Sequence, residues 1–367
     1  MSREAALHTL LFSGVIAVTG ILAAVSVRSF HPPEHVAIID GGVAKAFESH
    51  YEQNFPAKQL GVNLWAAIDY TLFREGRPGV VIGANDWLYT DEEFIVGDNV
   101  RTTFHANFAQ IAEVRAALEK AGVALVAALV PAKARIYSEF LADRKPAEPH
   151  VDLYDELLAR LAAEGIPTAD LRAPLTDGKQ QRQTYFRTDT HWTPWGARLA
   201  ATEVARVTRV SGLAPDDGSD YETHVERTAA HRGDLCNFLP LDPYFTRLLP
   251  PREPIDITRT DITRNQGTQK SSAAAADLFG DSKLPNVVLV GTSYSANPLW
   301  NFAGFLKEAL RADVASYARA GAGPFKPMLA YLKSTDFREH RPRLVIWEIP
   351  ERALLVTAEA DTAAQTR

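Results

Sequence analysis

Three residue types that together can activate a hydroxyl group occur at two places in this sequence. Asp189 and His191 stand two residues apart, just before the helix-start signal Thr193-Pro194, and Ser293 follows the glycine turn Gly291-Thr292. A serine hydroxyl becomes a nucleophile when an imidazole accepts its proton and a carboxylate fixes the tautomer of that imidazole. The sequence therefore predicts an acyl-transfer site in which Ser293 attacks, His191 is the base and Asp189 orients the imidazole.

The elements around these residues indicate how they would be positioned. From residue 104 onward, apolar runs typical of buried strands alternate with amphipathic helical stretches, and this alternation is typical of a parallel sheet covered by helices. We expect an α/β fold, a three-layer α/β/α sandwich with a mostly parallel sheet and the reactive residues at the carboxyl ends of strands. The expected strands are 80–83, 86–89, 123–130, 286–290, 314–317 and 343–348, and the expected helices are 104–118, 151–164, one beginning at Thr193, one from Asn297-Pro298 to 310, and 327–333.

The backbone near the candidate residues suggests how charge on a reacting oxygen could be stabilised. Residues two apart in an extended segment share a face, so Asp189 and His191 are expected to project to the same side. Gly291 permits a sharp bend, and the amides after Ser293 open toward a helix, where they can donate to an oxyanion. Further candidates beside the oxyanion are Tyr294, Gly321 and Gly323. Taken singly, each feature is also compatible with an ordinary turn or a helix cap.

Composition excludes several classes of protein. The chain has 367 residues, of which 46% are hydrophobic, and its formal net charge of −6 argues against a general nucleic-acid-binding protein. The single cysteine, Cys236, excludes an intramolecular disulfide and a thiolate-rich metal site. Neither His224 nor His231 stands at a zinc-type spacing, so we expect no metal and no other cofactor.

The N-terminal segment predicts export. Leu7 to Val27 is an apolar run long enough to cross a bilayer as a helix, with Arg3 before it and Arg28 after it. A small-residue site at Ala24-Val25-Ser26 would suit cleavage of a signal peptide, but the length of the run favours a retained anchor. The expected organisation is an anchor or signal at 1–30, a stalk at 31–79, a catalytic domain at 80–355 and a flexible tail at 356–367. Residues 211–285, rich in Asp, Pro, Thr and Arg, are expected to form an insertion with little regular helix.

The order of these motifs resembles the alginate O-acetyltransferase family of bacterial exopolysaccharide machinery, periplasmic enzymes with an SGNH-hydrolase-like domain. The resemblance covers about residues 80 to 355 and is carried by several motifs in order. They are Gly83-Ala84-Asn85-Asp86-Trp87-Leu88-Tyr89, Pro131-Ala132-Lys133-Ala134-Arg135-Ile136-Tyr137, Asp189-x-His191-Trp192, Arg232-Gly233-Asp234-Leu235, Gly291-Thr292-Ser293-Tyr294-Ser295 and Trp347-Glu348-Ile349-Pro350-Glu351-Arg352.

The resemblance implies that Ser293, His191 and Asp189 take up an acetyl group on the serine and pass it to a polysaccharide hydroxyl. It also implies a protein anchored to the inner membrane by Leu7–Val27 and facing the periplasm, beside a multi-pass membrane acyltransferase that supplies acetyl groups. Two alternatives remain open: an acetyl esterase that uses the same triad with water as acceptor, and a non-catalytic polysaccharide-binding scaffold.

Two features concern the mouth of the site. In ordinary SGNH hydrolases the serine precedes the acid and the histidine, so the order here looks circularly permuted; the strand expected to deliver an oxyanion asparagine reads Trp347-Glu348-Ile349-Pro350. Lys133 and Arg135, with Tyr137, follow the strand that ends at Pro131, and cations at the mouth would suit a uronate polymer, although solvated loop charges fit equally well. Trp192 and Trp195 are compatible with stacking on sugar rings or with core packing.

Overall fold

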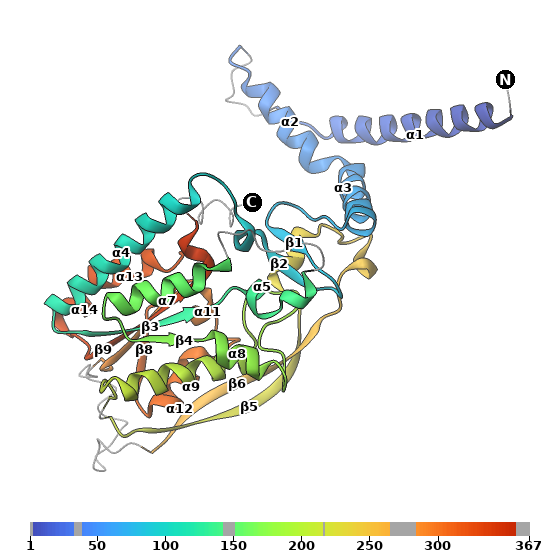
Figure 1. The fold of residues 1–367 in the computed structure, drawn as a ribbon. Helices are drawn as coiled ribbons and strands as arrows, with labels where there is room; N and C mark the ends of the chain where they lie inside the picture. The colour runs from blue at the N-terminus through green and yellow to red at the C-terminus, as the bar shows by residue number, and fades with distance from the viewer. Residues whose placement is uncertain (1–2, 33–38, 142–150, 216, 265–283, 357–367) are drawn as a thin grey trace. The chain divides into compact units, whose positions relative to one another are not determined.

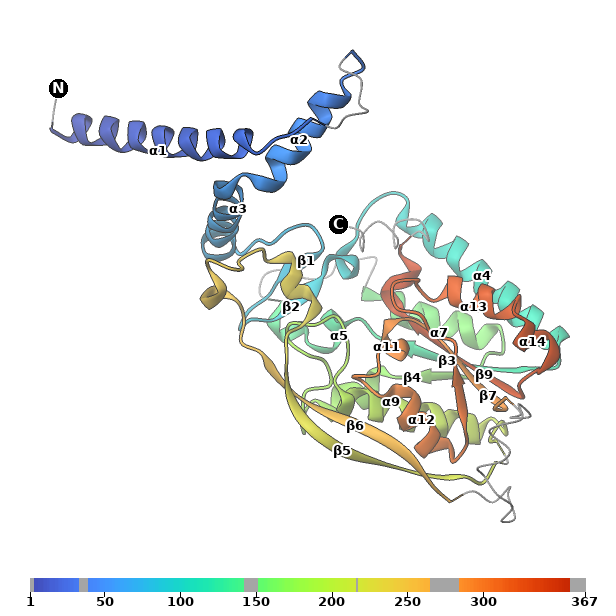
Figure 2. The ribbon, with the colours of Figure 1, turned by 180° about the vertical axis from the view of Figure 1, so that it is seen from behind.

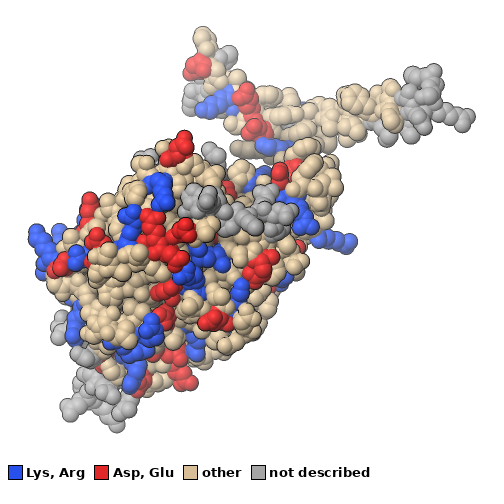
Figure 3. Space-filling view, in the orientation of Figure 1, with Lys and Arg blue, Asp and Glu red and all other residues tan. Residues whose placement is uncertain are grey.

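The computed structural model describes residues 3–32, 39–141, 151–215, 217–264 and 284–356. By compactness these form two units: residues 1–76 with 239–249, and residues 77–238 with 250–367. The predicted tail at 356–367 lies almost wholly outside the described residues. Charged side chains of both signs are mixed on the face that Figure 3 shows, in keeping with 39 basic and 45 acidic residues.

A five-stranded sheet forms the centre of the larger unit. All its neighbouring pairs are parallel, and the strand order is β4-β3-β9-β7-β8. The strands are β3 (Ala124–Val130), β4 (Thr168–Asp170), β7 (Val287–Val290), β8 (Val314–Ser316) and β9 (Leu344–Pro350). A separate antiparallel hairpin, β1 (Val80–Ile82) with β2 (Leu88–Thr90), comes before them. The predicted parallel sheet is confirmed; the short strand β4 was not predicted, because three residues carry too little apolar pattern.

Helices cover both faces of the sheet (Figures 1 and 2). Side chains that alternate along β3 belong to two different cores: Leu125, Ala127 and Leu129 to one, and Val126, Ala128 and Val130 to the other. The first core contains α4 (Val100–Lys120), α7 (Leu153–Ala163), α13 (Phe325–Leu332) and α14 (Thr335–Glu339). The second contains α8 (Arg172–Gly178), α9 (Pro194–Val210) and α12 (Phe302–Leu310). The three-layer α/β/α architecture is therefore confirmed.

Helix boundaries follow local chemistry, and one prediction was wrong. Thr193 caps α9 as expected, since its hydroxyl accepts a hydrogen bond from the Gly196 amide at 3.1 Å. No helix begins at Asn297-Pro298. Asn297 is extended, as residues before proline prefer, and α12 begins only after Asn301, which is left-handed with φ of 52°. A separate short helix, α11 (Ser293–Ala296), carries the candidate nucleophile instead.

The predicted insertion at 211–285 contains a long antiparallel ribbon. It pairs β5 (Asp220–His231) with β6 (Glu253–Arg264), and an irregularity at Val225/Arg227 shifts the register. The ribbon runs beside α9 and α12 (Figures 1 and 2). The Asn301 side chain donates hydrogen bonds to the ribbon, to the hydroxyls of Thr258 at 3.1 Å and Thr260 at 3.0 Å. The part of this insertion at 265–283 lies outside the described residues.

The smaller unit is more regular than the stalk predicted at 31–79. It contains α1 (Arg3–Arg28), α2 (Gly42–Asn54) and α3 (Pro56–Ile68), followed by a π-helical turn at Asp69–Phe73. Residues 239–249 of the insertion belong to this unit: the Asn63 side chain donates to the Pro240 carbonyl, and the Gln59 side chain donates to the Asp242 carbonyl at 3.2 Å. Within α1, His8–Val25 has a mean hydropathy of 1.9 and is long and apolar enough to cross a membrane, a property that signal sequences share.

Candidate active site

The structure brings the three predicted residues together. The Ser293 hydroxyl lies 2.6 Å from His191 Nε2, and His191 Nδ1 lies 2.6 Å from Asp189 Oδ1. Asp189 and His191 are buried, whereas Ser293 is partly exposed, so a substrate can reach the hydroxyl but water has little access to the carboxylate. This geometry suits transfer of the serine proton to the imidazole.

The segment that carries Asp189 and His191 is bent, not extended as predicted. Asp189 Oδ1 accepts a hydrogen bond from the His191 backbone amide at 2.9 Å, besides its contact with the ring. Such a turn arises because a short carboxylate side chain can bond to the backbone two residues ahead. The same oxygen therefore caps the turn and orients the imidazole.

The other oxygen of Asp189 has two more donors. His231, at the end of β5, places Nε2 2.8 Å from Asp189 Oδ2, and the Asp234 amide donates to the same oxygen at 3.1 Å. Burial would raise the pKa of Asp189, but hydrogen bonds from His191 and His231 outweigh it and hold that pKa well below its ordinary value. Asp189 is thus held as a carboxylate.

Two buried groups fix the backbone before Asp189. The Glu253 carboxylate accepts from the amides of Arg187 at 2.9 Å and Thr188 at 3.1 Å. Gly233 lies directly against this backbone: a Cβ at that position would come 2.5 Å from the Asp189 amide nitrogen and collide with the Thr188 carbonyl group. The Asp189 turn can form only because residue 233 has no side chain.

Lys133 is a structural residue, and the prediction that it lies at the site mouth was wrong. Its side chain is 1% exposed, and the ammonium donates to the carbonyls of Leu88, Arg187 and Asp189 at 2.5, 2.8 and 2.9 Å. Burial lowers its pKa to about 8, against the opposing effect of Glu93. Three carbonyls use all three donors of an ammonium, so Lys133 links β2 to the Asp189 turn.

Arg135 and Tyr137 are also tied into the protein. The Arg135 guanidinium forms an ion pair with the buried Glu351 and donates to the Val151 carbonyl at 3.0 Å. Tyr137 is buried, and its hydroxyl contacts the Thr184 hydroxyl at 3.2 Å. The Arg135 cation, which was expected to suit a uronate polymer, is therefore paired with a buried carboxylate of the protein itself.

The turn that carries Ser293 rests on a buried carboxylate. Glu348 of β9 is fully buried and accepts hydrogen bonds from the Thr292 amide at 2.7 Å and the Ser295 hydroxyl at 3.0 Å. Thr292 caps α11, so its oxygens accept from the amides of Tyr294, Ser295 and Ala296. The amides that follow Ser293 are therefore engaged within the turn and do not point at an oxyanion, in contrast to the expectation from sequence.

The carboxylate of Glu348 leaves no room for a side chain at Gly291. A Cβ at this position would lie 2.5 Å from Glu348 Oε2 and 2.9 Å from the Ser295 hydroxyl. We expect Gly291→Ala to destabilise the protein by about 1–3 kcal/mol through overpacking and to lower the rate of ester hydrolysis by roughly 100-fold through displacement of Ser293. Thermal unfolding and hydrolysis of a small acetyl ester measure the two effects.

A matched control is available on α3. A Cβ at Gly61 meets no atom within 4 Å, so Gly61→Ala is expected to keep full activity and to gain about 1 kcal/mol of helix stability. Equal effects of the two substitutions would show that the close approach of Glu348 to Gly291 does not matter.

The other predicted candidates lie around the imidazole and along the sheet edge. Tyr294 is fully buried with its ring edge-on to His191 at 4.8 Å, and its hydroxyl donates to the Thr190 carbonyl at 2.8 Å. Trp300 stacks on His191 at 5.4 Å between ring centroids. Gly321 and Gly323 lie in the loop that follows β8, the strand next to β7. In the described part of the chain, the backbone hydrogen bond between this loop and the serine turn is donated by the Arg319 amide to the Gly291 carbonyl.

Asp189, His191 and Asp234 are also spaced so that they could hold a cation. Their ligand atoms lie within 4.8 Å of one another. However, both ring nitrogens of His191 face partners, Ser293 and Asp189, and both oxygens of Asp189 already accept hydrogen bonds. This donor pattern fits proton transfer better than metal coordination.

Comparison with known proteins identifies the family. A family model described as an SGNH hydrolase-like domain of the acetyltransferase AlgX matches residues 80–351. The chain belongs to this family. Over 348 residues it is 47% identical to a probable alginate O-acetylase AlgJ of Pseudomonas fluorescens, covering 93% of this chain and 86% of the relative. A relative of the same description from Pseudomonas aeruginosa is 44% identical, covering 93% and 88%.

A solved structure agrees with this membership. The O-acetyltransferase domain of Pseudomonas putida AlgJ is 42% identical with a TM-score of 0.69, covering 77% of this chain and 94% of that domain. The present protein is therefore an O-acetyltransferase with an SGNH-hydrolase-like fold. The resemblance inferred from its motifs is confirmed.

Several residues around the site of this acetyltransferase were not predicted from sequence. They are His231, Glu253 and Glu348, together with Asp234 in its contact with Thr190. The sequence contained one signal for Glu348: it is a charged residue within an apolar strand, and such a residue must find partners when it is buried. The contact of His231 with Asp189 depends on where the ribbon ends, and local sequence does not contain that information.

Proposed function

We propose that this protein O-acetylates alginate through an acetyl-enzyme formed on Ser293. The observation that carries the proposal is the 2.6 Å contact between the Ser293 hydroxyl and His191 Nε2. In the first step the hydroxyl oxygen attacks the carbonyl carbon of an acetyl donor while His191 takes its proton. The bond to the leaving group breaks, the leaving group receives the proton, and the acetyl group stays on Ser293 as an ester.

The second step runs the same chemistry toward the acceptor. A sugar hydroxyl gives its proton to His191 and attacks the acetyl carbon, and Ser293 leaves with the proton returned to its oxygen. The negative charge of Asp189 stabilises the imidazolium in both steps. We propose that the Ser293 amide donates a hydrogen bond to the developing oxyanion, since within the described residues it donates to no protein acceptor. The amides of Gly321 and Gly323 are the candidates for the second donor.

The acceptor, location and partner are inferred from the relatives and from α1. Two relatives described as probable alginate O-acetylases are 47% and 44% identical to this chain, over 86% and 88% of their length, so alginate is the proposed acceptor. Because His8–Val25 is apolar enough to span a membrane, we propose that α1 anchors the protein to the inner membrane with the larger unit in the periplasm. A membrane acyltransferase would then supply the acetyl groups.

The test follows the fate of the acetyl group. We expect the protein, given a small acetyl ester and unacetylated alginate oligosaccharides, to attach acetyl to the oligosaccharide, as read by mass spectrometry and NMR. The matched control replaces the oligosaccharide with buffer, in which slow release of acetate is expected. If all acetyl appeared as free acetate in the presence of alginate, the protein would be an esterase and the proposal would be wrong.

A further inference from the structure

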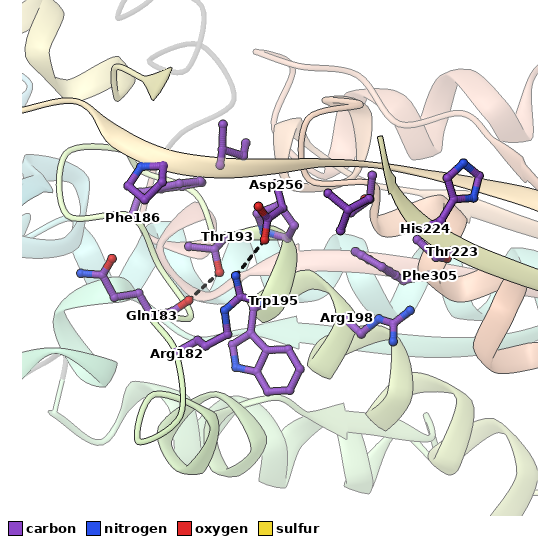
Figure 4. A pocket seen from close by; sticks show the side chains of 15 residues that line it. Arg182, Gln183, Phe186, Thr193, Trp195, Arg198, Thr223, His224, Asp256 and Phe305 are labelled. Carbon is purple, nitrogen blue, oxygen red and sulfur yellow. Dashed lines mark hydrogen bonds and ion pairs between the residues drawn. The ribbon is translucent and has the colours of Figure 1, made fainter. Parts of the chain in front are cut away.

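A concave site lies near the triad, separated from it by buried aromatic side chains. A pocket of about 380 Å³ is bounded by α9, α12, the β5–β6 ribbon and the connection that precedes the Asp189 turn (Figure 4). This volume falls within the range of sites that bind small molecules or single units of a polymer. None of the triad residues lines it, so the chemistry described above does not use this pocket.

A chain of ring contacts connects the pocket with the catalytic imidazole. Phe186 lines the pocket, and its ring lies 4.7 Å from His231 and 5.5 Å from Trp300. Both of these residues contact the triad: His231 bonds to Asp189, and Trp300 stacks on His191. Two side chains, Phe186 and then Trp300, therefore stand between the pocket and His191, and a polymer has to span them to occupy both places.

One face of the pocket is built from an anchored indole. Trp195, in the first turn of α9, donates its Nε1 hydrogen to the Gly178 carbonyl at 3.3 Å and remains partly exposed. Trp192, by contrast, is completely buried. Of these two tryptophans, only Trp195 is placed to stack on a sugar. Because one edge of its indole is already held by a hydrogen bond, binding a sugar would cost little side-chain entropy.

Two arginines with exposed side chains line the pocket, and each has one carboxylate partner. The charged residues of its lining are Arg182, Arg198 and Asp256. Arg182 pairs with Asp256 at 2.8 Å, and Arg198 pairs with Glu308 at 2.9 Å. These side chains are 64% and 41% exposed, so each guanidinium keeps donors on its solvent side for a ligand carboxylate.

We propose that this pocket binds a uronate residue of the acceptor polymer, with the sugar ring on Trp195 and its carboxylate on Arg182 and Arg198. This inference rests on the proposed function, since it assumes that the acceptor is a uronate polymer. The pocket holds a neighbouring residue of the chain while another residue presents its hydroxyl to Ser293. Recognition of charge at a distance from the reaction would let the enzyme select the polymer without interfering with the chemistry.

The test measures binding without catalysis. Full-length protein in detergent micelles is titrated with an alginate oligosaccharide and, separately, with a neutral glucan oligosaccharide of the same length. We expect the wild type to prefer the uronate, and Arg198→Gln to weaken uronate binding about tenfold because one charge-assisted contact is lost. Trp195→Ala should weaken it about as much, and Trp195→Phe should restore part of the affinity, because it keeps a ring although it cannot bond to Gly178.

The controls separate recognition from folding. Trp65 is 64% exposed and belongs to the smaller unit, so Trp65→Ala should bind like the wild type. Equal affinity of Arg198→Gln, Trp195→Ala and the wild type for the uronate, or equal affinity of the wild type for the neutral glucan, would overturn the inference. Acetylation of Ser293 by a small ester is measured separately: if it occurs without uronate binding in this pocket, only the present inference fails. If binding is as predicted but Ser293 is never acetylated, the catalytic proposal fails instead.

Discussion

Replacing Ser293 with alanine is expected to abolish formation of the acetyl-enzyme and to lower acetyl transfer by roughly 10⁴-fold or more, as removal of a nucleophile does in other triads. The hydroxyl makes its hydrogen bond to His191, and the surrounding turn is held by Thr292 and Glu348. The fold should therefore survive, with a loss of unfolding free energy within about 1.5 kcal/mol. Transfer to alginate oligosaccharides and thermal unfolding provide the two measurements.

A neighbouring serine provides the matched control. Ser295 lies in the same short helix, but its hydroxyl donates to Glu348 at 3.0 Å and does not face the imidazole. We expect Ser295→Ala to form the acetyl-enzyme with a rate loss smaller than about tenfold, which corresponds to about 1.4 kcal/mol. Full activity of Ser293→Ala, or equal losses in the two variants, would contradict the assignment of Ser293.

Asp189→Asn is expected to have the second largest effect, a fall in transfer rate of about 10⁴-fold with the fold retained. The amide removes the negative charge that stabilises the imidazolium of His191. The asparagine side chain also fits in neither orientation. Its NH₂ group would face the backbone N–H of His191 if it replaced Oδ1, and the backbone N–H of Asp234 if it replaced Oδ2. An unsatisfied buried donor costs about 1–3 kcal/mol of unfolding free energy.

The pH dependence of stability tests the state of this carboxyl group. Its folded pKa is held well below the unfolded value of about 3.9, so the stability that it contributes is complete above that value and is lost as the pH falls further. The difference in unfolding free energy between wild type and Asp189→Asn should be constant above about pH 5 and should shrink below about pH 4. Asp336→Asn is the matched control, because Asp336, on α14, accepts one hydrogen bond from the Tyr317 hydroxyl. A difference that grows on acidification would show that Asp189 is not an ionised carboxylate.

The central sheet and the triad were predictable because their signals are local. Each of β3, β7 and β9 is a continuous apolar run, and the alternation with helices restricts the arrangement to parallel pairs. Parallel strands end at one edge of a sheet, and Ser293 directly follows one of these strands. This rule placed Ser293 at the edge where open sheets hold their sites, whereas its contact with His191 depended on the fold and was implied in the sequence by the family resemblance.

The support around the triad was not predictable because it comes from long-range contacts. Lys133 looked like a loop cation, and only the fold shows that its ammonium meets three carbonyl groups from two separate segments. His231 reaches Asp189 because the β5–β6 ribbon ends beside the turn, and nothing near residue 231 in the sequence indicates that ending. The bent shape of the Asp189 turn depends in turn on Gly233 and Glu253, which also come from the ribbon side of the fold.

The location of the acetyl group on the enzyme tests most directly whether Ser293 is the nucleophile. Wild-type protein would be mixed with a small acetyl ester, quenched in acid within one turnover, digested and analysed by peptide mass spectrometry, with His191→Ala and Ser293→Ala in parallel. We expect one added acetyl group on Ser293 of the wild type, no acetyl on Ser293→Ala, and loss of the label when alginate oligosaccharide is added before the quench. Acetyl on another side chain of an active enzyme, or transfer without any labelled Ser293, would contradict this expectation.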